Sequence, residues 1–511
     1  MASSITSGTL GCSIGGEQVG MTELKDLRLL MASRYPIILI ETWEERRALQ
    51  LLRRIAMEQG LPVFSWTVLD GLRREEFTDT PSQKTNAEPF AALSQIRGST
   101  VPAIYVMCDL HPFLRDEPKN VRLIKEIALN HDQVGHHLVL LSHAMDLPPE
   151  LRRYAARCEL SMPDDTQLLA IVQDEARNYA KTSGIRVRTD RSSLDKVVGN
   201  LRGATFEDAR RLARGAIVDD GAITDTDIQG VNKAKFELLN MDGVLSYECD
   251  TARFAEVGGL ANMRRWLDKR ESAFRGDSGD IDAPKGVMLV GVQGGGKSLA
   301  AKAVAGMWGL PLLRLDMGAV YNKFFGESER NVRDSLKLAE TMAPCVLWID
   351  EIEKGISTGD NDGGTSRRVL GSFLTWMAER KAPVFVVATA NQIADLPPEL
   401  VRKGRFDEIF FVDLPDTTVR EDIFRIHLQR RRQEAGNFDL SLLAGMTEGF
   451  TGAEIEQVVV AALYSAQAEQ VSLDESHLRA EVAATVPLSV TMAESLQTLR
   501  QWCAERAVPA N

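Results

Sequence analysis

The stretch "KGVMLVGVQGGGKSLAAKAVAGMWG" (285–309) carries the clearest structural signal in the chain. Residues 285–291 form a nearly continuous apolar run, which is typical of a strand buried on both faces. A helical pattern occupies 298–309, and "GVQGGGKS" (291–298) between them matches G-x-x-x-x-G-K-[ST]. This order predicts a phosphate-binding loop, because the turn presents backbone N–H groups at a helix N-terminus. The alternative is a glycine-rich turn that merely precedes a lysine, and it would not explain both flanking elements.

We expect the loop to bind ATP. Lys297 would reach the β- and γ-phosphates, and the Ser298 hydroxyl would be a ligand of Mg²⁺. The residues predicted to contact the nucleotide here are Gly291, Val292, Gln293, Gly294, Gly295, Gly296, Lys297, Ser298 and Leu299.

A second chemical signal is "VLWIDE" (346–351), a buried strand that ends in two carboxylates. Parallel sheets bind ligands at the carboxyl ends of their strands. We expect Asp350 to act on the Mg²⁺ side, through water, and Glu351 to orient and deprotonate the attacking water. Taken alone, such a pair could also be a solvated strand end.

Further apolar runs at 310–316, 382–391 and 410–416 alternate with helical patterns. Strands that are apolar on both faces and alternate with helices predict a parallel sheet wrapped by helices. After residue 416 we expect no further strands, and helical patterns dominate, with 486–511 read as a helix that packs on this lid.

The hexapeptide "DLPPEL" occurs at 146–151 and again at 395–400, 249 positions later. "GLP" recurs at the same offset, and residues 36–64 align with 285–313 without a gap. The chain therefore reads as an α/β protein with tandem P-loop-type parallel-sheet modules, each followed by a helical lid, the first degenerate. The predicted divisions are a flexible arm (1–20), a first α/β module (21–160), its helical lid (161–245), an ATPase α/β domain (251–416) and a second lid with a C-terminal helix (417–511).

The first module lacks the phosphate loop. The aligned residues read "TWEERRAL" (42–49), with Ala48 at the lysine position and Leu49 at the hydroxyl position. Glu44 and Glu45 would repel phosphate. We therefore expect this module to bind no Mg·ATP by this mechanism and to be retained for its shape.

Composition narrows the class of protein. The chain has 511 residues and a formal net charge of −12, which disfavours DNA or RNA as a partner. Its six cysteines are scattered without a CxxC pair, which fits a reducing cytoplasm. We find no apolar run long enough for a membrane span, no secretory signal at the N-terminus and no HExxH motif.

These motifs together resemble the AAA ATPases, in particular the ring-forming kind that remodels proteins. The resemblance covers about 254–511 closely and is strongest to the uncharacterised AAA ATPases of algal chloroplasts and cyanobacteria, whose N-terminal half also lacks a phosphate loop. The segments that carry it, besides those above, are "FAEVGGL" (254–260), "ATAN" (388–391), "ELVRKGRFDE" (399–408), "IFRIHLQR" (423–430) and "GFTGAEIEQ" (449–457).

The resemblance implies roles for residues that the motifs alone do not assign. Val257, Gly258 and His427 would lie near adenine, Gly452 and Ala453 would lie along the nucleotide, and Asn391 would sense the γ-phosphate.

It also implies that Arg402 and Arg405 are arginine fingers, which act on a neighbouring subunit's ATP. Hydrolysis would then require a homo-oligomeric ring, in the family usually a hexamer. The alternative is that both arginines are structural and pair with carboxylates such as Asp407.

"NKFFGESERNVR" (322–333) resembles the loop that lines the pore of threading ATPases. Lys323, Phe324 and Phe325 would grip an extended polypeptide through apolar and backbone contacts. Phenylalanine is also a common core residue, so a buried position is the alternative.

The sequence thus predicts an ATPase that uses ATP and Mg²⁺ to remodel or thread a protein whose identity it does not reveal. An alternative is an ATP-gated binding or assembly switch without threading. A third, a nucleic-acid translocase, fits the acidic balance poorly.

Overall fold

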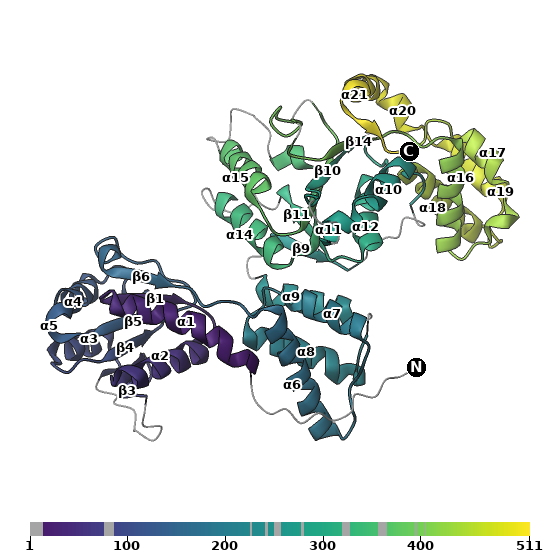
Figure 1. The fold of residues 1–511 in the computed structure, drawn as a ribbon. Helices are drawn as coiled ribbons and strands as arrows, with labels where there is room; N and C mark the ends of the chain where they lie inside the picture. Colours follow the sequence, from purple (N-terminus) through teal and green to yellow (C-terminus); the bar gives the residue numbers. More distant parts are fainter. Residues whose placement is uncertain are drawn as a thin grey trace. The chain divides into compact units, whose positions relative to one another are not determined.

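The computed structural model describes residues 14–75, 86–224, 227–240, 244–249, 257–276, 281–318, 328–355, 365–393, 396–402 and 404–511. The chain divides into two compact units. Figure 1 labels their helices and strands. The first comprises Met1–Val187 and Gly203–Ile217, and the second comprises Arg188–Arg202 and Val218–Asn511.

The first unit is built on a six-stranded sheet in the order β3-β2-β4-β5-β1-β6. Its described pairs are parallel except β2 with β3. Its elements are α1 (Ile14–Ala32), β1 (Ile37–Glu41), α2 (Glu45–Gln59), β2 (Val63–Thr67), β3 (Gly71–Arg74), α3 (Pro89–Gly98), β4 (Ile104–Cys108), α4 (Pro118–Leu129), α5 (His131–Val134), β5 (His137–Ser142), β6 (Ala155–Cys158), α6 (Asp165–Ser183) and most of α8 (Phe206–Asp220).

The second unit contains a seven-stranded sheet in the order β15-β14-β10-β13-β12-β11-β9. Its α/β elements are β9 (Leu245–Glu248), α10 (Ala261–Asp268), α11 (Glu271–Arg275), β10 (Gly286–Gly291), α12 (Lys297–Trp308), β11 (Leu312–Asp316), α14 (Ser328–Thr341), β12 (Cys345–Asp350), α15 (Thr365–Glu379), β13 (Val384–Ala390), β14 (Glu408–Val412), α21 (Ala493–Arg506) and β15 (Val508–Pro509). The remaining elements are β7 (Arg188–Thr189), α7 (Arg191–Leu201), β8 (Ala222–Ile223), α9 (Asp227–Leu239), α16 (Thr417–Arg430), α17 (Leu440–Met446), α18 (Gly452–Ala468), α19 (Glu475–Ala484) and α20 (Leu488–Thr491).

The two sheets share one topology, which confirms the predicted tandem α/β fold. The order β2-β4-β5-β1-β6 in the first matches β11-β12-β13-β10-β14 in the second, strand for strand along the chain. Each sheet also carries an antiparallel strand beyond β2 or β11, namely β3 or β9.

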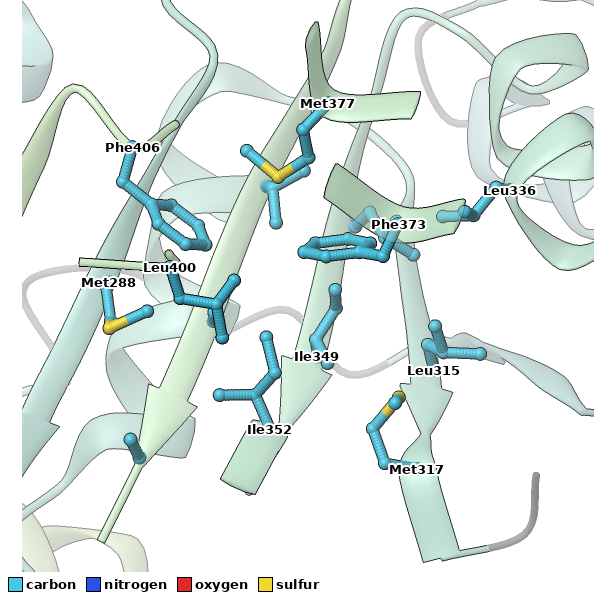
Figure 2. Packing of buried hydrophobic residues seen from close by; sticks show 14 of the residues in the cluster. Met288, Leu315, Met317, Leu336, Ile349, Ile352, Phe373, Met377, Leu400 and Phe406 are labelled. Atoms are coloured by element: carbon cyan, nitrogen blue, oxygen red, sulfur yellow. The ribbon is translucent and has the colours of Figure 1, made fainter. Parts of the chain in front are cut away.

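The second sheet is buried on both faces, because its central strands carry apolar side chains at nearly every position. Ile349 and Leu315 point to one face, where Phe373 and Met377 of α15 pack against them (Figure 2). On the other face Trp308 of α12 packs against Phe385 with ring centroids 4.7 Å apart. Each fully buried large side chain contributes roughly 1.5–3 kcal/mol, so this core fixes the strand ends that carry the site.

Two predicted divisions differ from the structure. Helix α1 begins at Ile14, so residues 14–20 of the expected arm are helical. The expected boundary near 245–251 includes β9, which pairs with β11 as an edge strand. Side chains alternate along β9, so Leu245 is buried while Ser246 faces solvent, and an edge strand can therefore carry polar residues.

The helices of the expected first lid (161–245) contribute to both units, α6 to the first and α7 and α9 to the second, and the bounds of this lid stay a prediction. Lys235 of α9 connects these helices to the second sheet's domain, because it is buried and donates to the carbonyls of Arg202 (2.5 Å) and Thr341 (2.8 Å), at the ends of α7 and α14.

The expectation that strands end at residue 416 is wrong, and 486–511 does more than pack on the lid. Leu488 donates to Glu454 of the lid helix α18. Helix α21 then buries Leu496 and Leu499 in the core of the sheet, and β15 pairs in parallel with β14. The segment returns to the sheet because its apolar face matches that core rather than the lid.

Candidate active site

A cavity of about 380 Å³ lies at the carboxyl ends of the second sheet's central strands. The phosphate loop, the ends of β12 and β13, and helices α16 and α18 of the lid all contribute to its wall. Its lining includes the predicted residues Val257, Gly258, Gln293, Gly294, Gly295, Gly296, Lys297, Ser298, Leu299, Asp350, Glu351, Asn391, His427, Gly452 and Ala453.

The phosphate loop depends on glycine at two positions. Gly294 and Gly296 adopt left-handed φ values of +75° and +94°. A Cβ at Gly294 would lie 3.1 Å from the Cβ of Ala453, so a larger residue there would require the lid to move away from the loop by a few tenths of an ångström. The geometry favours an open row of backbone N–H groups next to the N-terminus of α12.

Lys297 is buried, and its Nζ donates to the carbonyls of Gly291 (2.8 Å) and Val292 (2.7 Å). Gly291 and Val292 lie outside the cavity lining and act here through their carbonyl oxygens. Burial lowers the pKa of Lys297 to about 8, although the charges of Glu353 and Asp350 oppose the shift. A buried ammonium held only by carbonyls is suited to bind an anion that enters the cavity.

Asp350 is held by two neighbours that the sequence analysis did not single out. The Thr389 hydroxyl donates to its Oδ1 at 2.7 Å, and the Arg314 guanidinium lies 3.1 Å from its Oδ2. Thr389 also accepts the backbone N–H of Glu351 at 3.0 Å. Thr389 lies within "ATAN", one residue beyond the strand partner of Ile349, so strand register could have identified it.

Asn391 connects the two strand ends. Its amide donates to Oε1 of Glu351 at 2.8 Å, and its backbone N–H donates to Oε1 of Glu353 at 2.9 Å. Burial raises the pKa of Glu353 above its usual range, and the backbone N–H of Asn391 opposes this shift. Glu353 therefore fixes the backbone from which Asn391 reaches Glu351.

The lid closes one side of the cavity. The backbone N–H of Ala453 donates to the Gly294 carbonyl at 3.3 Å. His427 of α16 is buried, and burial lowers its pKa, although Glu456, 3.5 Å from its Nδ1, opposes the shift. A neutral imidazole at this place is compatible with the uncharged adenine base of a nucleotide.

Gly258 lies against the lid helix α16. A Cβ at Gly258 would lie 2.9 Å from Cγ1 of Ile423, so only glycine permits this approach. Cavity residues beyond those predicted are Leu260, Thr389, Val412, Asp413, Pro415, Val419, Ile423, Ile426, Glu456 and Asn511.

Arg402 and Arg405, both described, lie outside the cavity lining. Arg402 is exposed, and Arg405 is partly buried with its Nη1 donating to the Leu374 carbonyl at 3.0 Å. Lys323, Phe324 and Phe325 of the predicted pore loop fall outside the described residues.

The residues present fit Mg·ATP. Ser298 and Asp350 line the cavity together and offer the hydroxyl and carboxylate oxygens that Mg²⁺ prefers. Lys297 and the glycine-rich loop supply positive potential for phosphates.

In the first module, the place that corresponds to the phosphate loop of the second is occupied by the module's own side chains. Glu44, in the loop between β1 and α2, accepts the backbone N–H of Glu207 at 3.2 Å in the first turn of α8. Arg47 donates to Glu44 at 2.8 Å and to Glu23 at 2.6 Å, and its guanidinium lies 4.2 Å from the Phe206 ring centroid. In the second module the aligned N–H, that of Ala453, faces the phosphate loop.

Among the described residues, no helix is long and apolar enough to cross a membrane. That part of the chain also holds no group of three or more His, Cys, Asp or Glu side chains placed to bind a metal ion.

Comparison with known proteins agrees with this geometry. Residues 287–414 match the family described as "ATPase family associated with various cellular activities (AAA)", and 437–480 match the AAA+ lid domain. Residues 23–160 and 166–242 match the N-terminal and second domains of SpoVK-like AAA ATPases.

Relatives extend over nearly the whole chain. The "Uncharacterized AAA domain-containing protein ycf46" of Guillardia theta is 34% identical over 497 residues, which cover 95% of this chain and 96% of that protein. The proteasome-activating nucleotidase of Aeropyrum pernix is 38% identical over 315 residues, covering 59% of this chain and 75% of that protein. The ATP-dependent zinc metalloprotease FtsH of Ralstonia pickettii is 34% identical over 274 residues, covering 52% of this chain and 35% of that protein. The chain therefore belongs to the AAA family and is an ATPase.

Proposed function

We propose that this chain forms a ring that couples Mg·ATP hydrolysis to the remodelling or threading of a protein partner. The observation that carries the proposal is that the two predicted finger arginines lie apart from the other groups of the site. One chain supplies the phosphate loop, both carboxylates and the lid, whereas Arg402 and Arg405 lie outside the cavity. Phosphoryl transfer gains from positive charge opposite the phosphate loop, so we infer that a second copy provides it, in a hexameric ring.

In this mechanism Lys297 exchanges the carbonyls of Gly291 and Val292 for the β- and γ-phosphate oxygens. Ser298 and Asp350 would hold Mg²⁺, Asp350 through water, and the ion would supply positive charge beside the phosphates. Thr389 and Arg314 orient Asp350 from either side.

Glu351 takes a proton from the attacking water. The water oxygen bonds to the γ-phosphorus, and the bond between the γ-phosphorus and the β-phosphate oxygen breaks. Asn391 holds Glu351 before ATP arrives and contacts the γ-phosphate once it is bound. Arg402 and Arg405 of the neighbouring copy stabilise the charge that develops on the transferred group.

A protein partner is supported by the relatives. The printed names of two of them describe a nucleotidase that activates the proteasome and an ATP-dependent protease. The chain itself has no HExxH motif, so we propose remodelling without proteolysis. The described cysteines Cys108, Cys158, Cys249, Cys345 and Cys503 are free thiols, which supports a reducing cytoplasm.

The first test is particle mass in solution, without nucleotide and with ATP, for the unaltered chain and for Glu351→Gln. We expect a uniform, ATP-dependent assembly that Glu351→Gln traps. Particles that stay monomeric in every condition would contradict the composite site and favour an ATP-gated switch without a ring.

Phe324→Ala tests threading separately. It should leave ATP turnover intact and abolish remodelling of a captured protein. Remodelling at the unaltered rate would contradict a gripping role for this residue.

A further inference from the structure

The segment 486–511 reaches both sides of the nucleotide cavity. Asn511 lines the cavity, and Arg500 of α21 holds Asp413, another lining residue, with Nη2 2.9 Å from Oδ1 and Nε 3.0 Å from Oδ2. Asp413 follows β14 directly and precedes the lid. At the other end of the segment, Leu488 donates to Glu454 of α18 at 2.7 Å.

Ala510 caps helix α10 on the side of the cavity formed by Val257 and Gly258. Its carbonyl accepts the backbone N–H groups of Asn262 (3.0 Å) and Met263 (3.2 Å), which are donors of the first helical turn. Its own N–H donates to the Phe411 carbonyl at 2.9 Å. Ala510 is buried, so this cap is shielded from water.

Asn511 fixes the loop that leads into this helix. Its Oδ1 accepts the backbone N–H of Leu260, and its backbone carbonyl accepts Nδ2 of Asn262. Gly259 and Leu260 adopt left-handed φ values of +78° and +65°. A left-handed conformation is costly for leucine, so the loop needs such outside contacts to hold it.

We propose that residues 508–511 are part of the ATP site, with Asn511 as a positioning residue that holds the 257–260 loop for the base. This inference rests on the proposed ATP site. Among the described residues, no hydrogen bond or ion pair joins residues 508–511 to the phosphate loop, so this segment organises the base side of the cavity rather than the chemistry of hydrolysis.

The coupling must be reciprocal. If the segment organises the cavity for ATP, bound ATP must in turn stabilise the segment by the same free energy. Amide exchange of Ala510, whose N–H bonds to Phe411, should therefore slow in the presence of ATP.

The test compares Asn511→Ala and Asn262→Ala with Gln497→Ala, an exposed residue of α21 that serves as the control. ATP affinity is measured by calorimetry with the full chain and Mg²⁺. We expect each of the first two variants to weaken binding about 5- to 20-fold, because each removes hydrogen bonds that hold the loop. Gln497→Ala should bind as the unaltered chain does.

Hydrogen exchange by mass spectrometry supplies a second measurement that does not depend on activity. Asn511→Ala should speed exchange at Leu260, and exchange in the core strand β12 should be unchanged. Unchanged affinity together with unchanged exchange at Leu260 would overturn the inference while leaving the ATP site in place. A lack of ATP binding by the unaltered chain and the control would overturn the proposed ATP site as well.

Discussion

The amide Nδ2 of Asn391 lies 2.8 Å from Oε1 of Glu351 and joins the ends of β13 and β12. The carboxylate proposed to activate water is therefore held by the group proposed to sense the γ-phosphate. We infer that ATP competes with Glu351 for this amide. Binding of the γ-phosphate would then release one carboxylate oxygen at the moment when it is needed for water.

Glu351→Gln should abolish turnover without abolishing ATP binding. Glutamine keeps the size of the side chain and an acceptor for Asn391, but its amide cannot take a proton. We expect kcat to fall by about 10²- to 10⁴-fold, with the Kd for ATP nearly unchanged. Phosphate release and calorimetry measure the two quantities. The matched control is Glu379→Gln, which alters an exposed carboxylate on α15. If Glu351→Gln turned over ATP nearly as fast as this control, the proposed role of Glu351 would be contradicted.

Glu353 should act through Asn391. Glu353→Ala leaves the backbone N–H of Asn391 without its 2.9 Å partner, whereas Glu353→Gln preserves an acceptor oxygen. Loss of a buried hydrogen-bond partner costs about 1–3 kcal/mol, so we expect kcat to fall roughly 5- to 100-fold in the alanine variant. Steady-state kinetics should show recovery of most of this loss in Glu353→Gln. Equal kcat values in both variants would show that the acceptor does not matter.

Arg47 should stabilise the first module. Its guanidinium neutralises Glu23 and Glu44, whose side chains are only 4% and 5% exposed. Arg47→Ala leaves two buried carboxylates unpaired, which typically costs about 3–5 kcal/mol. Urea unfolding followed by tryptophan fluorescence measures the change, with exposed Arg46→Ala as the control. A midpoint equal to that of the control would mean that the Arg47 contacts contribute little.

Lys235 should make stability depend on pH. Burial lowers its pKa from 10.5 to about 8, so the folded state disfavours the ammonium. The resulting loss of unfolding free energy is fully present below pH 8. The free energy of unfolding then rises between pH 8 and 10.5, because in this range the unfolded chain binds more protons than the folded chain. Relative to Lys235→Met, the unaltered chain should therefore gain about 3 kcal/mol across this window.

Urea unfolding of both proteins at pH 7.5 and pH 10 measures the Lys235 effect as a difference, which removes the contribution of other titrating groups. A difference that stays constant with pH would contradict it. Two helix-end carbonyls, those of Arg202 and Thr341, explain how an ammonium is tolerated there without a carboxylate.

Local patterns predicted the central part of the fold and of the site. The apolar runs of β10, β12 and β13 reflect burial on both faces, and the glycine-rich loop needs backbone geometry that its own residues supply. Most of the nucleotide residues expected from these motifs line one cavity for this reason.

Features set by packing between distant segments were not predictable in the same way. β15 has two residues and no periodicity of its own, and its position follows from α21, whose apolar face fits the sheet core. Asn511 meets Leu260 across 251 positions of sequence. The bonds that join α9 to the ends of α7 and α14 come from a buried lysine, Lys235, which the sequence presents as an ordinary surface residue.

The central claim is that each active site is shared between two copies, and mixing two inactive variants tests it most directly. One variant is Glu351→Gln, which keeps its arginines; the other is Arg402→Ala with Arg405→Ala, which keeps its water-activating carboxylate. Each alone should hydrolyse ATP at least 100-fold more slowly than the unaltered chain, and a mixture should regain activity where an intact pocket faces intact arginines. A mixture no more active than the sum of its parts, although mass measurement shows that the two variants assemble together, would contradict the shared site.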